Sequence, residues 1–338
     1  MPFKNKKNKT LVIQTAKIGD YANSSVIFEP LKKFDIVLDE INLAFADYDE
    51  RIEKKFLIND IKTKKISKIK FALNLAREGY ENVFVLMPNS LNLFLARCTM
   101  AKNITTIKHY NVSSDFALLS LGMRKISHSL DNLTLKTYLK MLDINELNFE
   151  KQLQKPLFMP QQNLIKSDKF KIGLSLSAGN KMKTPPREIW RQILNIFYKF
   201  ECEIYIFGVG DEAKLLTNLD TRNLKITSLI DKIALKELPF YISQMNLYIS
   251  SDTGNYYIAD SMRVPTICLM GPCFASEQRG VFDSLAISSN LPPISSVFKT
   301  IRNIDASAYF RLSNDDLTHI KDFTKRIYEA WQIANKTA

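Results

Sequence analysis

Four consecutive small or polar residues, Ser251-Asp252-Thr253-Gly254, directly follow an apolar run that begins at Leu247. A helical pattern comes next, and a second apolar run then ends at Gly271-Pro272. This order predicts strand, turn, helix and strand. Such a turn directs backbone N–H groups and the positive end of a helix dipole at whatever lies above it, which suits a phosphate or an array of sugar hydroxyls. The alternative is that Asp252 only caps the helix.

A second carboxylate, Asp20, follows the first apolar run of the chain in the glycine-containing loop Ile18-Gly19-Asp20. A carboxylate in such a loop, at the carboxyl end of a strand, should face the cleft where ligands of doubly wound folds bind. The alternative here is again a helix N-cap, for the helix expected from Tyr21 onward.

Apolar runs alternate with helical patterns along the whole chain. Strands are expected at 10–15, 34–39, 83–87, 104–107, 171–176, 203–207, 247–251 and 264–271. Helices are expected at 21–33, 66–78, 91–101, 187–200, 235–244 and 314–334. This alternation predicts α/β architecture, in which parallel sheets are covered on both faces.

The length of 338 residues exceeds what one hydrophobic core usually supports. The pattern lapses between about residues 150 and 169, around Pro156 and Pro160, which indicates an interdomain connection. We therefore expect two doubly wound domains, 1–160 and 161–315, that face each other across a cleft. The amphipathic helix in 316–338 is a candidate to pack back on the first domain.

The composition, 46% hydrophobic and 24% charged, is typical of a soluble globular protein. No apolar stretch approaches the ~20 residues of a membrane span, and the N-terminus lacks the apolar core of a signal peptide, which predicts a cytoplasmic protein. The net charge of +12 calls for an acidic partner or surface. Lysines concentrate between Lys54 and Lys70, and a solvated helix face is favoured there over a binding patch.

Several classes of site lack a matching pattern. The four cysteines, Cys98, Cys202, Cys268 and Cys273, are scattered through apolar runs, so we interpret them as small core residues rather than a disulfide framework. No metal-binding spacing occurs, and no metal is expected. Zinc-finger, basic-zipper and RNA-binding motifs are absent from the sequence, which disfavours a nucleic-acid partner.

The second half of the chain resembles glycosyltransferase family 9, the heptosyltransferases with the GT-B fold. The resemblance rests on Ser251 to Gly254, on the Val-Pro-Thr run that ends in Gly271-Pro272, and on the strand that ends in Gly208 before Asp211-Glu212. It also includes the Lys-x-x-Pro-x-x-x-Trp spacing of Lys183, Pro186 and Trp190. In the first half, Ile18-Gly19-Asp20 and Pro30-Leu31-Lys32 match as well.

The chain departs from the family pattern at two positions. Tyr257 stands where family members commonly carry a histidine, and Pro185 stands where a tryptophan is usual. These departures bear on the identity of the donor sugar more than on the fold.

The resemblance implies roles for particular residues. Asp20 matches the catalytic base, and Lys183 matches the lysine that contacts the nucleotide, with Lys181 as a near alternative. The ammonium of Lys183 would stabilise the diphosphate as it leaves the donor sugar. The remaining implied donor-binding residues are Ser177, Asp211, Glu212, Ile233, Asp252, Thr253 and Gly254. Trp190 is interpreted as a packing residue.

The resemblance further implies an inverting glycosyltransferase without a cofactor or metal. It would move a heptose from ADP-heptose to a phosphorylated lipopolysaccharide or lipooligosaccharide core, in peripheral contact with the anionic inner membrane. Two alternatives stay open: a family member with another nucleotide sugar or a protein or capsule acceptor, and a non-catalytic binder of nucleotide sugars or glycolipids.

Overall fold

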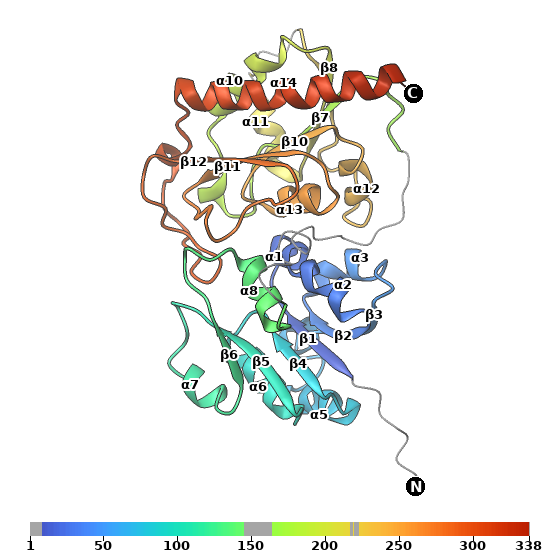
Figure 1. Cartoon of the computed structure of the whole chain (residues 1–338), viewed down its shortest axis with the longest axis vertical. Coiled ribbons are helices and arrows are strands. Elements are labelled where there is room, and N and C mark those ends of the chain that lie inside the picture. Colours follow the sequence, from blue (N-terminus) through green and yellow to red (C-terminus); the bar gives the residue numbers. More distant parts are fainter. Residues whose placement is uncertain (1–8, 145–163, 217–218, 220–222, 338) are drawn as a thin grey trace. The chain divides into compact units, whose positions relative to one another are not determined.

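The computed structural model describes residues 9–144, 164–216, 219 and 223–337 of the chain, with the side chains of Asp211, Leu216 and Thr337 excepted. It divides into two compact units, Met1–Phe158 and Met159–Ala338. Each unit contains a six-stranded sheet with helices on both faces (Figure 1). Most of the predicted connection at 150–169 lies outside the described residues.

Unit 1 is built on a parallel sheet with the strand order β3-β2-β1-β4-β5-β6. The strands are β1 (Thr10–Gln14), β2 (Phe34–Leu38), β3 (Ile52–Leu57), β4 (Asn82–Val85), β5 (Asn103–Lys108) and β6 (Arg124–Ser127). The helices are α1 (Ile18–Ser24), α2 (Phe28–Leu31), α3 (Leu43–Ala46), α4 (Asn59–Lys62), α5 (Lys68–Glu78), α6 (Ser90–Cys98), α7 (Phe116–Leu119) and α8 (Thr134–Met141), with 3-10 turns η1 (Ser25–Ile27) and η2 (Glu40–Asn42).

Unit 2 repeats this order as β12-β11-β10-β7-β8-β9, again with parallel pairing. Its strands are β7 (Phe170–Ser175), β8 (Cys202–Phe207), β9 (Lys225–Ser228), β10 (Leu247–Ser251), β11 (Thr266–Gly271) and β12 (Ser284–Ser288). Its helices are α10 (Arg187–Phe197), α11 (Ala213–Leu216), α12 (Leu238–Ile242), α13 (Gly254–Ser261) and α14 (Asn314–Thr337), with 3-10 turns η4 (Lys181–Lys183), η5 (Gly210–Glu212) and η6 (Ser307–Phe310).

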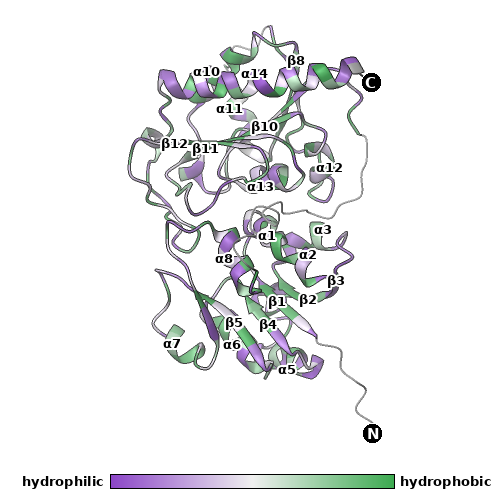
Figure 2. Ribbon diagram, viewed as in Figure 1, coloured by the Kyte–Doolittle hydropathy of each residue, from purple (hydrophilic) through white to green (hydrophobic). Residues whose placement is uncertain are grey.

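The central strands explain why these sequences fold as doubly wound sheets. Strands β2, β10 and β11 are buried at every position, as expected where helices cover both faces of a parallel sheet. Figure 2 shows the apolar colour concentrated on such strands, whereas α14 alternates between apolar and polar residues. The predicted fold of two doubly wound α/β units is therefore confirmed.

Helix α14 completes the core of unit 2. Ile320 and Ile327 are buried in that core, and Tyr328 and Trp331 pack edge-on against Phe170 at 5.2 and 5.6 Å between ring centroids. Residues 316–338 were a candidate to pack back on the first domain, whereas the structure gives their apolar side to the core of the second unit.

Two local predictions were wrong. The lysines between 54 and 70 do not form one helix face, because Lys54 and Lys55 belong to the edge strand β3 and Lys62 to α4. The helix expected at 21–33 is split into α1, η1 and α2. Ser24 and Ser25 donate side-chain hydrogen bonds of 2.7 Å to carbonyls one turn back, which competes with regular helix geometry.

The cysteines and Trp190 lie in the places expected of packing residues. All four cysteines are free thiols within the described residues, Cys268 and Cys273 buried and the other two half-buried. Trp190 is fully buried, as expected of a packing residue. Among the described residues, no helix is long and apolar enough to cross a membrane.

Candidate functional site

The centre of the site in unit 2 is the point where the order of the strands reverses. Strands β7 and β10 are paired neighbours in the sheet, although two other strands separate them in the sequence. At the carboxyl ends of such a pair the following loops diverge, which leaves room for a ligand. The loop after β7 leads to Ser177 and η4, and the loop after β10 carries Asp252, Thr253 and the start of α13.

Asp252 and Lys183 form an ion pair at this point. Lys183 Nζ lies 2.6 Å from Asp252 Oδ2, and the side chains are 20% and 8% exposed, respectively. A charge pair this buried is weakly screened by water and salt. The structure therefore brings together two residues that lie 69 positions apart and that the sequence selected independently.

The other carboxylate oxygen of Asp252 is bound by Tyr257. The hydroxyl of Tyr257 donates a hydrogen bond of 2.6 Å to Asp252 Oδ1. Burial raises the pKa of Asp252, but Lys183, Tyr257 and the Cys273 thiol together bring it below its ordinary value of 3.8. Burial and the Asp252 charge raise the pKa of Tyr257 well above its ordinary value, so the phenol stays a donor. Asp252 is thus held as an anion.

Sequence reasoning recorded Tyr257 only as a departure from the family pattern and missed this contact. A tyrosine in the first turns of the helix that follows Asp252 can reach back to it, and this spacing was the available signal. The alternative that Asp252 is a helix cap is wrong, because the N-cap of α13 is Thr253, in an extended conformation. Asp252 instead forms the ion pair with Lys183.

The loop that presents Lys183 is closed by its own polar residues. Thr184 Oγ1 accepts a hydrogen bond of 3.1 Å from the Ala178 backbone N–H, and Asn180 Nδ2 donates one of 2.9 Å to the Ile301 carbonyl. Upstream, the Trp190 indole donates to the Leu176 carbonyl at 3.0 Å, which fixes the end of β7 beside Ser177. Lys181 shares η4 with Lys183 but is exposed.

Glu212 forms the second half of the site, at the end of β8. Its Oε1 accepts a hydrogen bond of 3.2 Å from the Val209 backbone N–H. Its carboxylate lies so close to Gly208 that a Cβ there would come within 2.4 Å of Glu212 Oε2. Burial and the Asp231 charge raise the pKa of Glu212, while Val209 and Ser177 oppose the rise by hydrogen bonding. Ser177 and Glu212 are therefore partners.

The two remaining candidates of unit 2 lie near this carboxylate along the chain. Ile233 is half-buried in the loop after β9. That loop is tied to the Glu212 loop, because the Gly210 N–H donates to Asp231 Oδ1 at 2.8 Å and the Asp231 N–H to the Gly208 carbonyl at 3.1 Å. Asp211 lies in η5, but its side chain is outside the described part of the structure.

Asp20 lies in unit 1, in the first turn of α1 directly after β1. Its loop is held from several sides: Gln14 Nε2 donates to the Asp20 carbonyl at 3.3 Å, and Asn42 Nδ2 donates to the Ala16 carbonyl at 2.8 Å. The N-cap of α1 is Lys17, so the alternative that Asp20 is the cap is wrong. Gln14, which sequence reasoning did not single out, helps to position this loop.

No group of three or more His, Cys, Asp or Glu residues in the described ranges could hold a metal ion. The chemistry available at the unit 2 site is that of a buried anion-cation pair, a second carboxylate and the N-terminus of α13. These groups suit a ligand that carries both phosphates and hydroxyls.

Comparisons with known proteins bear on the family and the fold of the chain. A sequence model of glycosyltransferase family 9 (heptosyltransferase) matches residues 70–299, which is more than half of the chain. A lipooligosaccharide heptosyltransferase 2 from Campylobacter jejuni is 28% identical over 149 residues, or 42% of this chain and 44% of that protein. The alignment thus spans less than half of this curated relative.

Solved structures show the same fold. The E. coli ADP-heptose LPS heptosyltransferase II superposes with a TM-score of 0.67 at 14% identity, over 96% of this chain and 99% of that chain. The E. coli heptosyltransferase WaaC with ADP superposes with a TM-score of 0.63 at 14% identity, over 94% of this chain and 99% of that chain. These structures share the architecture of both units, and the match of the family model over more than half of the chain gives the assignment: the chain belongs to glycosyltransferase family 9.

Proposed function

We propose that this chain is an inverting heptosyltransferase that transfers a heptose from ADP-heptose to the core of a lipopolysaccharide or lipooligosaccharide. Support comes from the family match and from similar folds that were solved with ADP and with ADP-2-deoxy-2-fluoro heptose. Unit 2 would bind the donor and unit 1 the acceptor.

The observation that carries the proposal is the Lys183–Asp252 pair at the switch point of unit 2. A diphosphate that leaves the anomeric carbon gains negative charge, and an ammonium already held in place stabilises that charge without reorganisation. Asp252 positions Lys183 and accepts hydrogen bonds from hydroxyls of the donor sugar. Thr253 and Gly254 would contribute the backbone at the start of α13 to the phosphates.

The nucleoside end of the donor is assigned to the Glu212 side of the site. A carboxylate accepts hydrogen bonds from two vicinal hydroxyls, so Glu212, with Asp211 beside it, would bind the ribose. Ser177 would contact the diphosphate next to Lys183, and Lys181 would lie at the exposed edge. Ile233 would lie against the adenine ring of the nucleotide.

Asp20 would act as the general base in unit 1. It takes the proton from the acceptor hydroxyl while that oxygen attacks the anomeric carbon, and the bond from this carbon to the ADP oxygen breaks in the same displacement. The heptose is thereby transferred with inversion, and ADP departs with the bonding electrons. Neither a metal nor another cofactor takes part in this scheme.

The acceptor is proposed to be a phosphorylated glycolipid, which the protein would meet at the cytoplasmic face of the inner membrane. The net charge of +12 supports peripheral contact with an anionic surface. No nucleic-acid partner is proposed.

The first experiment measures thermal stabilisation by ADP, UDP, GDP and CDP at matched concentrations. A nucleotide at ~100 times its dissociation constant stabilises by about 2.7 kcal/mol. We expect a shift with ADP that Lys183→Ala abolishes, followed by transfer from ADP-heptose to a lipooligosaccharide acceptor. A shift with UDP would assign another nucleotide sugar, and ADP binding without turnover on any glycolipid, capsule or protein acceptor would indicate a binder.

A further inference from the structure

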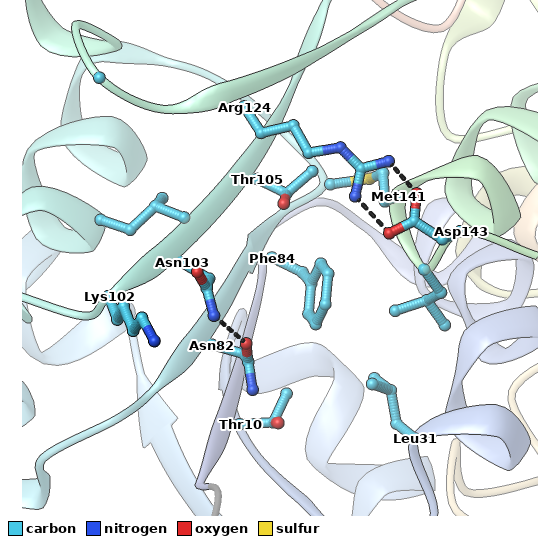
Figure 3. A pocket seen from close by; sticks show the side chains of 13 residues that line it. Thr10, Leu31, Asn82, Phe84, Lys102, Asn103, Thr105, Arg124, Met141 and Asp143 are labelled. Carbon is cyan, nitrogen blue, oxygen red and sulfur yellow. Dashed lines mark hydrogen bonds and ion pairs between the residues drawn. The ribbon is translucent and has the colours of Figure 1, made fainter.

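Unit 1 contains a pocket that the proposed reaction does not use. Its volume is about 510 Å³, within the range of small-molecule sites. It lies over the amino-terminal ends of β1, β4, β5 and β6, and Figure 3 shows the side chains that line it. Asp20 instead follows the carboxyl end of β1. The five residues of β1 alone span about 16 Å, so the two places are distinct.

The floor of the pocket consists of two rows of side chains that the register of the sheet aligns. Thr10, Asn82 and Asn103 are paired across β1, β4 and β5. Phe84, Thr105 and Arg124 are paired across β4, β5 and β6. Because alternate residues of a strand point to the same face, both rows lie on one face of the sheet.

The opposite face of the same strands is ordinary core. Leu11, Val83 and Val85 are buried there against α5 and α6. On the pocket side, α8 and α2 are short, and Met141 and Leu31 at their ends line the rim instead of covering the rows. A central strand of a covered parallel sheet normally carries apolar residues on both faces. Polar side chains around one half-buried phenylalanine indicate a surface adapted to a ligand.

The charges at this pocket largely cancel. Arg124 makes two hydrogen bonds to Asp143, one of 2.7 Å from Nη1 to Oδ2, and a third of 3.3 Å to the Lys140 carbonyl. Lys102 adds one ammonium at the exposed edge. A guanidinium that already faces a carboxylate in two-point geometry has little capacity left for an anion. The pocket therefore favours a neutral ligand.

The uncharged polar groups offer both donors and acceptors. Asn103 Nδ2 donates a hydrogen bond of 3.0 Å to Asn82 Oδ1. This leaves Asn103 Oδ1 as an acceptor and Asn82 Nδ2 as a donor for other groups. Thr10 and Thr105 add hydroxyls, and the ring of Phe84 lies among them (Figure 3). Alternating donors and acceptors around an aromatic ring match a sugar, which has hydroxyls at its edges and C–H groups on its faces.

We propose that this pocket binds a neutral sugar residue of a glycan, at a second site separate from the reaction centre. The inference does not depend on the proposed donor, because it concerns binding alone. In a glycosyltransferase such a site would hold a part of the glycan remote from the reacting hydroxyl, and it would add affinity without a role in bond formation.

The test is binding of free monosaccharides to the full chain, followed by NMR with labelled methionine methyl groups. The probes are the methyl glycosides of glucose, galactose and N-acetylglucosamine, and L-glycero-D-manno-heptose, with inorganic phosphate as the anionic probe. Met141 lines the pocket, whereas Met245 is buried in unit 2. We expect the Met141 methyl signal, assigned with Met141→Leu, to shift with at least one sugar at about 1 mM affinity, while Met245 stays unchanged.

Matched variants tie the signal to the pocket. Asn103→Ala and Phe84→Leu should each weaken binding about 5-fold, the loss expected for one hydrogen bond or its equivalent in contact. Thr105→Val removes a hydroxyl that lines the pocket and should also weaken binding. Lys125→Gln should not, because Lys125 points to the opposite face of the sheet from its neighbour Arg124. Unchanged melting temperatures would show that the variants are folded.

Other results would overturn the proposal. Binding that survives both Asn103→Ala and Phe84→Leu would place the sugar elsewhere. A Met141 shift with phosphate alone, lost in Arg124→Gln, would make the pocket an anion site. If the Met141 signal shifted with none of the probes, the proposal would also be refuted. Thermal stabilisation by ADP tests the proposed function separately.

Discussion

The hydroxyl of Tyr257 and the ammonium of Lys183 bind different oxygens of the same carboxylate, Asp252, each at 2.6 Å. The departure from the family pattern at position 257 is therefore part of the site. It supplies a neutral donor that fixes the anion against which the lysine is held.

Tyr257→Phe removes this donor and keeps the ring. The free energy of unfolding should fall by about 1 kcal/mol and the transfer rate by about 10-fold, because Asp252 and Lys183 lose their fixed orientation. Denaturant unfolding and steady-state kinetics measure the two effects. Tyr256→Phe is the matched control: its hydroxyl is equally buried but bonds Ser284 and Gly280. Equal loss of activity in both variants would contradict this positioning role.

Lys183→Met leaves the Asp252 carboxylate buried without its charge partner. We expect a loss of about 3 kcal/mol in unfolding free energy at pH 7, and much less when Asp252→Asn is added, because the unpaired charge is then removed. Urea titrations of the two single variants and the double variant measure the coupling. Additive losses would mean that the pair is not coupled.

The same pair predicts a pH dependence. The folded-state pKa of Asp252 lies below 3.8, so its contribution to stability is present above that pH and disappears as the pH falls through the folded pKa. In Lys183→Met, burial should raise the pKa of Asp252 instead. The stability difference between the natural chain and the variant should therefore narrow as the pH is lowered toward 4 and below. A difference that stays constant from pH 7 to pH 3 would contradict the assignment.

Glu212→Gln tests the proposed ribose contact. In the natural chain, 2′-deoxy-ADP should bind about 10-fold more weakly than ADP, because a hydrogen bond to a charged acceptor is lost. In Glu212→Gln this ratio should approach one. Since burial raises the pKa of Glu212 above 4.5, the ratio should also fall as the pH drops toward that pKa. Isothermal titration measures both, and an unchanged ratio in the variant would assign the ribose to another residue.

Asp20→Asn tests the base. Transfer should fall by at least ~10²-fold, while stabilisation by ADP should remain, because Asp20 belongs to the other unit. Glu29→Gln, at an exposed carboxylate of α2, is the control and should retain full activity. If Asp20→Asn lost ADP binding and turnover to the same extent, its role would be in folding or donor binding instead.

The inner strands of both sheets could be predicted from sequence, and the outer ones could not. Strands β3, β6, β9 and β12 were missed, and they are the two edges of each sheet. Edge strands are covered on fewer sides, so their burial alternates or is partial, as in the pattern of β9. Their sequences then lack the continuous apolar run that identified β10.

In the site, individual residues could be predicted from sequence, whereas their contacts could not. Residues that follow a strand within a motif, such as Asp252 and Glu212, could be selected by their place after a predicted strand. The pairing of Lys183 with Asp252 requires the tertiary fold, because η4 has no apolar periodicity of its own. The contact of Tyr257 and the support from Gln14 depend on side-chain direction, which a pattern of residue types does not determine.

The contact of Phe170 with Tyr328 and Trp331 joins the first strand of unit 2 to its last helix. During synthesis, β7 therefore cannot complete its packing until residue 331 has left the ribosome. Unit 1, in which the described core residues all lie between positions 11 and 141, is free to fold much earlier. Until then, Phe170 and the apolar surface beside it stay exposed, so the newly made second unit depends for its solubility on the arrival of α14.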